Sequence, residues 1–141
     1  MSLAEQIVGT WLLVSSVDID KDGTVTDTWG QNPLGTYMFD ANGRFAQILT
    51  RSGLPVVPNR TQTTADQAIA VVLGSIAMFG SYRIDEEAET ITVRFEASTF
   101  AKFKGTEATR SIVMASPDDL MIRNSARSGG SRGESVWRRA K

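Results

Sequence analysis

The sequence predicts a mainly β protein, an antiparallel up-and-down barrel of about eight to nine strands with one α-helix. Short runs rich in Val, Ile, Thr and aromatic residues alternate with turn signals along almost the whole chain, as successive hairpins would. A single longer segment has the apolar spacing of a helix. The 141 residues are enough for one core, so one domain over residues 1–141 is expected.

Closure of the sheet is expected because a sheet of this many strands tends to curl, and a closed barrel leaves no exposed edge. A barrel of about eight strands has room for one small ligand. A two-layer sandwich is the alternative arrangement of the same strands.

The N-terminal strands are separated by two strong turn signals. A short helical turn is expected over 3–8, before the first strand. Asp22-Gly23 and Asn42-Gly43 each lie between apolar runs, and such pairs favour tight hairpins because a type I′ turn needs positive φ at both central residues. The runs expected to be strands here are 11–19, 24–29, 35–39 and 44–50.

The middle of the chain contains the expected helix, over 64–77. Thr64 and Gln67 form the pattern of a capping box, with the threonine at the N-cap. The residues at helical spacing behind it are Ala65, Ile69, Val72, Leu73 and Ile76. A long loop over 52–62 precedes the helix, which either caps one mouth of the barrel or packs outside it.

Further hairpins are expected after the helix. Their turns lie at 85–89, 117–119 and 128–131, where Asp, Glu, Gly, Pro and Ser gather. The runs expected to be strands are 79–85, 90–97, 106–115, 120–125 and 133–139.

Composition excludes several kinds of chemistry. The chain has no histidine and no cysteine, so cysteine nucleophiles, Ser-His-Asp triads and zinc fingers are impossible, and neither a metal nor a cofactor is expected. No apolar run approaches the roughly 18 residues of a membrane span. Since the N-terminus also lacks the features of a signal peptide, we expect a cytoplasmic protein, either a monomer or a homodimer.

The net charge of −1 hides an asymmetry. Residues 1–122 carry nine positive and fifteen negative charges, whereas residues 123–141 carry six positive charges and one negative. A basic end can bind nucleic acid, but we interpret this one as a solvated last hairpin facing an acidic body, and we expect no nucleic-acid partner.

Alternation along each strand predicts which side chains face the interior. Arg110 and Gln47 are polar residues on otherwise apolar faces. A buried guanidinium needs a partner, which an anionic or carbonyl-bearing ligand, an internal Glu or Tyr, or a place at the barrel mouth would supply. Tyrosines either donate to a ligand or fill the core. The expected ligand-binding residues are Arg110, Gln47, Tyr82, Tyr37, Phe45, Phe95 and Met114.

Motifs at both ends and along the chain resemble the lipocalin-like domain family, a group of calycin-type barrels. Gly9-Thr-Trp11 opens the first long strand, and Val136-Trp-Arg-Arg139 closes the chain. The matching internal motifs are Asp22-Gly23, Gly30-x-x-Pro33-x-Gly35, Gly80-Ser-Tyr82, Glu96-Ala-Ser98, Gly105-Thr106 and Arg110. The resemblance implies that Trp11 plugs one barrel end and that a basic residue of the last strand, Arg138, lies over it.

Three functions are compatible with this interpretation. The favoured hypothesis is a protein that binds a small apolar or amphipathic molecule in the barrel. One alternative is an isomerase or cyclase acting on a polyketide-like or terpenoid substrate, with Tyr82 or Arg110 as hydrogen-bond donor. The other is a non-catalytic interaction module whose barrel is filled by side chains.

Overall fold

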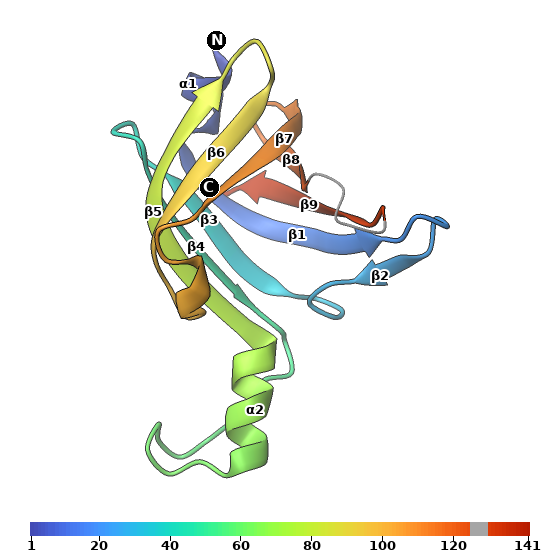
Figure 1. The fold of residues 1–141 in the computed structure, drawn as a ribbon, viewed down its shortest axis with the longest axis vertical. Helices are drawn as coiled ribbons and strands as arrows, with labels where there is room; N and C mark the ends of the chain where they lie inside the picture. The colour runs from blue at the N-terminus through green and yellow to red at the C-terminus, as the bar shows by residue number, and fades with distance from the viewer. Residues whose placement is uncertain (125–129) are drawn as a thin grey trace.

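The computed structural model describes residues 1–124 and 130–141 and shows a closed antiparallel barrel (Figure 1). The strands are β1 (Gly9–Ile19), β2 (Val25–Asp27), β3 (Leu34–Phe39), β4 (Arg44–Thr50), β5 (Ser75–Asp85), β6 (Thr90–Ser98), β7 (Glu107–Ala115), β8 (Asp119–Asn124) and β9 (Arg132–Arg139). The helices are α1 (Leu3–Ile7), α2 (Ala65–Gly74) and a 3₁₀ turn, η1 (Ala101–Phe103).

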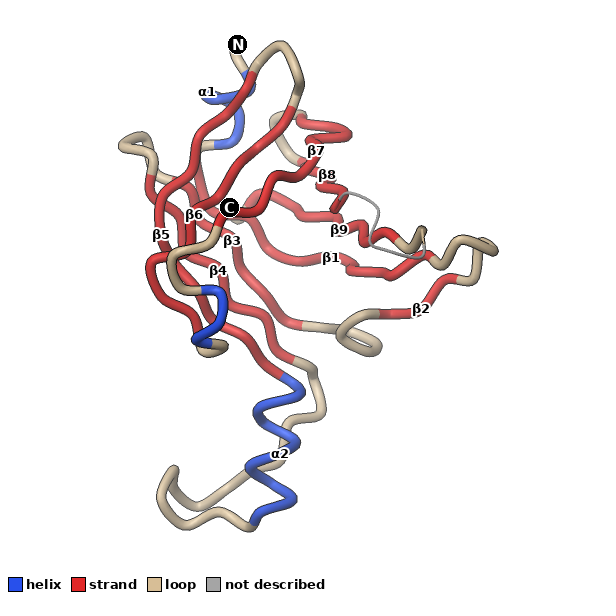
Figure 2. Tube along the Cα trace, in the orientation of Figure 1, coloured by secondary structure: helices blue, strands red, loops and turns tan. Residues whose placement is uncertain are grey.

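Eight of these strands form the barrel. From β3 to β9 each strand pairs antiparallel with the next one along the chain. Strand β1 pairs with both β3 and β9 and so closes the sheet, whereas β2 pairs with β1 alone and lies outside the ring (Figure 2). The predicted up-and-down barrel is therefore confirmed, and the sandwich alternative is wrong.

The largest departure from the expected elements is at the end of α2. The capping box forms as predicted, with Thr64 Oγ1 accepting from the Gln67 amide at 3.2 Å and the Gln67 side chain accepting from the Thr64 amide at 3.0 Å. The helix ends at Gly74 rather than at residue 77, because β5 begins at Ser75 and pairs there with Thr50 of β4. Long-range strand pairing overrides the local helical spacing.

One smaller expectation changes and another is confirmed. The strand expected over 24–29 is reduced to β2, and the helical turn expected over 3–8 is confirmed as α1. The end of the strand expected over 120–125 and the start of the turn at 128–131 lie outside the described residues. Among the residues described, no helix has both the length and the apolar character needed to cross a membrane.

One end of the barrel is closed by α1 and Trp11. Ile7 and Trp11 are fully buried, and Trp11 Nε1 donates a hydrogen bond of 2.9 Å to the Ile7 carbonyl. Backbone amides of Leu3 and Ala4 donate to the Glu86 carboxylate in the β5–β6 turn, at 2.7 and 3.0 Å. These bonds fix α1 across the opening.

The arginine over Trp11 is Arg139, so the expectation for Arg138 is wrong. The Arg139 guanidinium lies 4.2 Å from the centre of the Trp11 ring. Side chains alternate along β9, and Trp137 faces inward, so Arg138 faces outward, where it pairs with Asp119 at 3.4 Å. The next residue, Arg139, points toward the end of the barrel that α1 and Trp11 close.

An aromatic cluster fills the half of the barrel next to α1. Tyr37 stacks on Phe39 with ring centroids 4.3 Å apart, and it makes edge contacts with Phe45 and Trp137. All four side chains are buried. This half of the interior is a solid core, so any open space lies in the other half.

Candidate functional site

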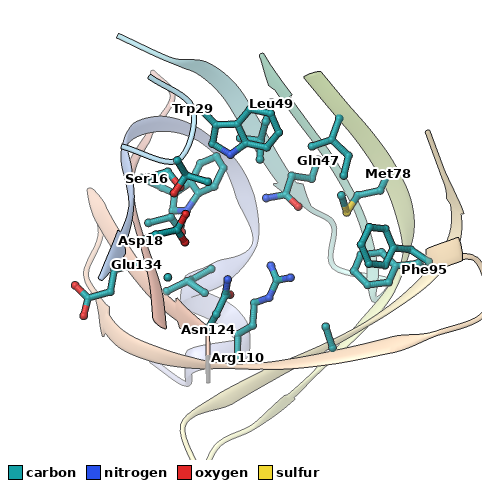
Figure 3. Close-up of a pocket in the computed structure, with 18 of the residues that line it drawn as sticks. Ser16, Asp18, Trp29, Gln47, Leu49, Met78, Phe95, Arg110, Asn124 and Glu134 are labelled. Carbon is teal, nitrogen blue, oxygen red and sulfur yellow. The ribbon is translucent and has the colours of Figure 1, made fainter. Parts of the chain in front are cut away.

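The other half of the barrel contains a cavity of about 600 Å³ (Figure 3). Its walls come from the second half of β1, the start of β5 and β9, and the facing parts of β4, β6, β7 and β8. Lys102, Thr106 and Glu107 also line it and are exposed to solvent, so the cavity reaches the surface beside η1. The alternative hypothesis, a barrel filled by side chains, is therefore wrong.

Apolar side chains form most of the cavity surface. Trp137 separates the cavity from the aromatic cluster, since its ring contacts Tyr37 on one side and lines the cavity on the other. The Trp137 Nε1 group donates to Ser135 Oγ at 2.8 Å, so the indole is held in one orientation. The other large apolar lining residues are Trp29, Leu49, Ile76, Met78, Phe95, Phe103 and Ile122.

Arg110 points into this apolar space from the middle of β7 (Figure 3). Alternation places it inward, between Ala108 and the buried Ile112. Within residues 1–124 and 130–141 its guanidinium has no hydrogen-bond or ion-pair partner. The positive charge of Arg110 also acts on the neighbouring core. Burial raises the pKa of the Tyr37 hydroxyl, and the charge of Arg110 partly opposes that rise.

Gln47 points into the cavity from β4 (Figure 3). Only 5% of this residue is exposed, yet its side-chain amide has no hydrogen-bond partner in the described part of the chain. Buried polar groups in proteins are nearly always hydrogen-bonded. Arg110 and Gln47 therefore both need a polar group from whatever occupies the cavity.

A third polar group comes from β8. Asn124 is the cross-strand neighbour of Arg110, and its side chain lies beside Asp18 of β1 on the same wall. Gly133 makes room for both, because a Cβ there would lie 3.0 Å from Asn124 Nδ2 and 3.5 Å from Asp18 Oδ1. The cavity thus has one polar wall around Arg110, while its remaining surroundings are mainly apolar and include Gln47.

The expected site residues fall into three groups. Arg110, Gln47 and Phe95 line the cavity. Tyr37 and Phe45 lie in the aromatic cluster and do not line it. Tyr82 also lies away from the cavity, and its hydroxyl donates to the Asp40 carbonyl at 2.6 Å.

The inward position expected for Met114 is wrong. The side chain is on the outer surface and 44% exposed. The register of β7 with β8 shifts between Ile112 and Met114, so a β-bulge inverts the alternation beyond that point. None of the described lining residues comes from α2, so this helix does not form the cap considered as one alternative.

Sequence reasoning missed Asp18, Ser16 and Trp29 as lining residues. The register of β1 with β9 shifts between Leu13 and Ser15, so the inward positions change parity within one strand. Trp29 lies in the loop after β2, where alternation does not apply. Asn124 could have been found, because it shares the inward parity of Leu120 and Ile122.

A metal centre has no support among these residues. In the part of the chain that the structure describes, no group of three or more Asp or Glu side chains is arranged to hold a metal ion. The cavity is a mainly apolar chamber into which Arg110, Gln47 and Asn124 point. The other charged residues that line it are Asp18, Lys102, Glu107 and Glu134.

These features define a small calycin-type barrel with an internal cavity, a fold that typically binds small ligands. The sequence model of the lipocalin-like domain family matches residues 8–140, and the chain belongs to this family.

A solved structure agrees on the fold. A lipocalin-like protein from Bacteroides uniformis is similar at a TM-score of 0.52 and 16% identity, over 96% of this chain and 99% of that one. Two designed proteins are similar at lower scores. A redesigned β-barrel has a TM-score of 0.49 and 14% identity, over the full length of both chains. A de novo designed fluorescence-activating β-barrel has a TM-score of 0.49 and 16% identity, over 99% of both. No curated protein matches the sequence.

Proposed function

We propose that this protein binds a small amphipathic molecule whose apolar body fills the barrel cavity and whose anionic or carbonyl group lies at Arg110. The observation that carries the proposal is the pair of inward-facing polar side chains, Arg110 and Gln47, without partners in the described chain. Their surroundings are otherwise mainly apolar.

The size and walls of the cavity suit a ligand of this kind. Small-molecule sites commonly measure about 300–1,000 Å³ and combine apolar walls with a few placed polar groups. The cavity of about 600 Å³ lies within that range. Burying roughly 200 Å² of apolar ligand surface would contribute about 5 kcal/mol before the cost of association.

The charge of Arg110 favours an anionic head group over a neutral one. A guanidinium binds a carboxylate, sulfonate or phosphate through paired N–H donors, and such charge-assisted bonds are stronger than neutral ones. A neutral apolar ligand would leave the guanidinium desolvated without compensation. The Gln47 amide faces the same space and supplies a further donor and an acceptor.

Two fluorescent probes that differ by one charged group test this proposal. 1-Anilinonaphthalene-8-sulfonate carries an anionic group on the same aromatic body as neutral N-phenyl-1-naphthylamine. We expect one sulfonate probe per chain, with energy transfer from Trp29 and Trp137 because both line the cavity. Arg110→Met should weaken sulfonate binding roughly tenfold or more, as loss of a charged hydrogen bond does, and leave the neutral probe nearly unchanged.

Arg138→Met is the matched control, because Arg138 lies on the outer surface and pairs with Asp119 at 3.4 Å, and neither residue lines the cavity. It should change neither affinity. If Arg110→Met weakens both probes equally, or neither, Arg110 does not hold the head group. If neither probe binds the unmodified protein, the cavity is not a site for amphipathic molecules of this size.

A further inference from the structure

The helix α2 stands away from the barrel, at the end opposite α1 (Figure 1). Ile69, Val72 and Leu73 follow one another at helical spacing and are 56%, 55% and 69% exposed. Together with the neighbouring Val71 we call them the α2 stripe. Apolar residues at such spacing normally face a core. Here they face solvent.

A second unpaired apolar surface lies on the outside of the barrel. A groove of about 380 Å³ runs over β4, β5 and β6, and we call it the outer groove. It is lined mainly by Ala46, Ile48, Ala77, Phe79, Ala97 and Thr99. The side chains of Leu12 and Met38 extend the same outer face over β1 and β3, and both are exposed.

The α2 stripe cannot reach the outer groove of its own chain. The helix ends at Gly74 and β5 begins at the next residue, so the strand follows the helix without a connecting loop. Residues Ala77 and Phe79 of the groove follow within five residues of that junction. Folding back over so short a distance would break the β4–β5 pairing that begins at Ser75.

A second copy of the chain has no such restriction. Each copy offers one stripe and one groove, so a two-fold axis lets both contacts form at once, as an isologous dimer requires. Among the described residues, neither surface brings an unpaired charge into the contact. Arg44 and Glu96, at the edge of the groove region, already pair with each other, and the charged residue of α2, Asp66, is in the first turn.

The area is that of a stable interface. The large apolar side chains of the two surfaces are Val71, Val72, Leu73, Ile69, Leu12, Met38, Ile48 and Phe79, exposed by 36–69%. With roughly 150–200 Å² for a fully exposed large side chain, and only Phe79 aromatic among them, they present on the order of 600–800 Å² per copy. A standard protein interface buries about 800 Å² of each partner.

A membrane surface suits these residues less well. Helices that lie in the bilayer interface are rich in Lys and Arg on the polar face. The helix α2 contains neither, and its first turn is acidic. We propose that the protein forms a two-fold homodimer in which the α2 stripe of each copy packs into the outer groove of the other.

Light scattering after size-exclusion chromatography tests the assembly. We expect a mass twice the 15.3 kDa of the chain at micromolar concentration. Val72→Asp and Ile48→Asp should each raise the dimer dissociation constant roughly thirtyfold or more, the effect of losing a central interface residue. Val25→Asp is the control: Val25 is 60% exposed on β2, outside both surfaces, and its replacement should leave the dimer intact.

Cross-linking gives a second test that does not depend on disruptive variants. The chain has no cysteine, so a Val72→Cys chain and an affinity-tagged Ile48→Cys chain can be mixed and mildly oxidised. We expect a disulfide-linked pair of the two variants. A mixture of Val25→Cys with the tagged Ile48→Cys chain should give little of that product.

Three results would overturn the proposal. The first is a monomer at micromolar concentration. The second is a dimer that Val72→Asp and Ile48→Asp leave unchanged, with no preference for the Val72–Ile48 cross-link. The third is a monomer that sediments with vesicles of phosphatidylcholine and phosphatidylglycerol through the α2 stripe, because the occupant of that surface would then be a bilayer.

Discussion

The guanidinium of Arg139 lies over the indole of Trp11, with 4.2 Å between the guanidinium carbon and the ring centre. The same guanidinium donates to the backbone carbonyls of Gln6, Val8 and Pro117 at 2.6, 2.9 and 2.6 Å. One side chain thus links the last strand to the segment that closes the barrel. The contact joins opposite ends of the sequence.

Replacing Arg139 should therefore be costly. Arg139→Ala removes a cation–π contact and three charge-assisted hydrogen bonds, and we expect the free energy of unfolding to fall by roughly 3 kcal/mol. Urea denaturation followed by tryptophan fluorescence measures this change. Arg138→Ala is the control and should cost no more than about 0.5 kcal/mol, because Arg138 is exposed and makes a surface ion pair with Asp119. Equal losses would show that the bonds of Arg139 contribute little.

Gly80 should not tolerate a side chain. A Cβ at this position would lie 1.8 Å from the Arg94 carbonyl oxygen, where β5 and β6 shift register. The nearest atoms are backbone, so the two strands would have to separate. We expect Gly80→Ala to lower the free energy of unfolding by about 3 kcal/mol or more.

Gly53→Ala is the comparison for Gly80. Gly53 lies in the loop before α2, and within the described residues no atom comes within 4 Å of the place that a Cβ would take there. This replacement should change the urea midpoint only slightly. A Gly80→Ala protein as stable as Gly53→Ala would mean that the bulge between β5 and β6 adjusts at little cost.

Stability should fall in acid partly through Glu96. Hydrogen bonds from Arg44, one of them 2.8 Å from Nη2 to Oε2, hold the pKa of Glu96 below its usual value of 4.5. A carboxyl whose pKa is lower in the folded protein stabilises it above the unfolded pKa, and that contribution disappears as the pH falls through the folded value.

Urea unfolding at pH 7 and at pH 3 measures this effect. The decrease in stability between the two should be smaller in Glu96→Gln than in the unmodified protein. Both partners are about half exposed, so added salt should reduce the difference. An identical acid decrease in the two proteins would exclude Glu96 as a contributor.

The cap of α2 should act locally. Thr64→Ala removes the side chain that accepts from the Gln67 amide, a loss of about 1 kcal/mol of helix stability. Because α2 stands away from its own barrel, amide exchange in α2 should accelerate while exchange in β7 and β8, which lie outside the outer groove, stays unchanged. Thr64→Ser retains the hydroxyl and should restore protection. Faster exchange throughout the barrel would mean that α2 is coupled to the core.

Local patterns in the chain were sufficient to predict the class of fold and most inward positions. Turn pairs such as Asn42-Gly43 and regular alternation locate the hairpins, because both are local consequences of backbone sterics. The type I′ geometry expected at these pairs is wrong, since Gly23 and Gly43 have positive φ but Asp22 and Asn42 do not. The same alternation placed Arg110, Gln47 and Phe95 on the interior face, where they line the cavity.

Contacts between distant segments set the features that these patterns missed. Bulges in β1 and β7 invert the alternation, which brings Asp18 into the cavity and turns Met114 outward. Pairing with β4 ends α2 at Gly74, and the orientation of the last strand selects Arg139 rather than Arg138 for Trp11. Register, bulges and closure depend on which strands meet in the folded barrel, so no local pattern specifies them.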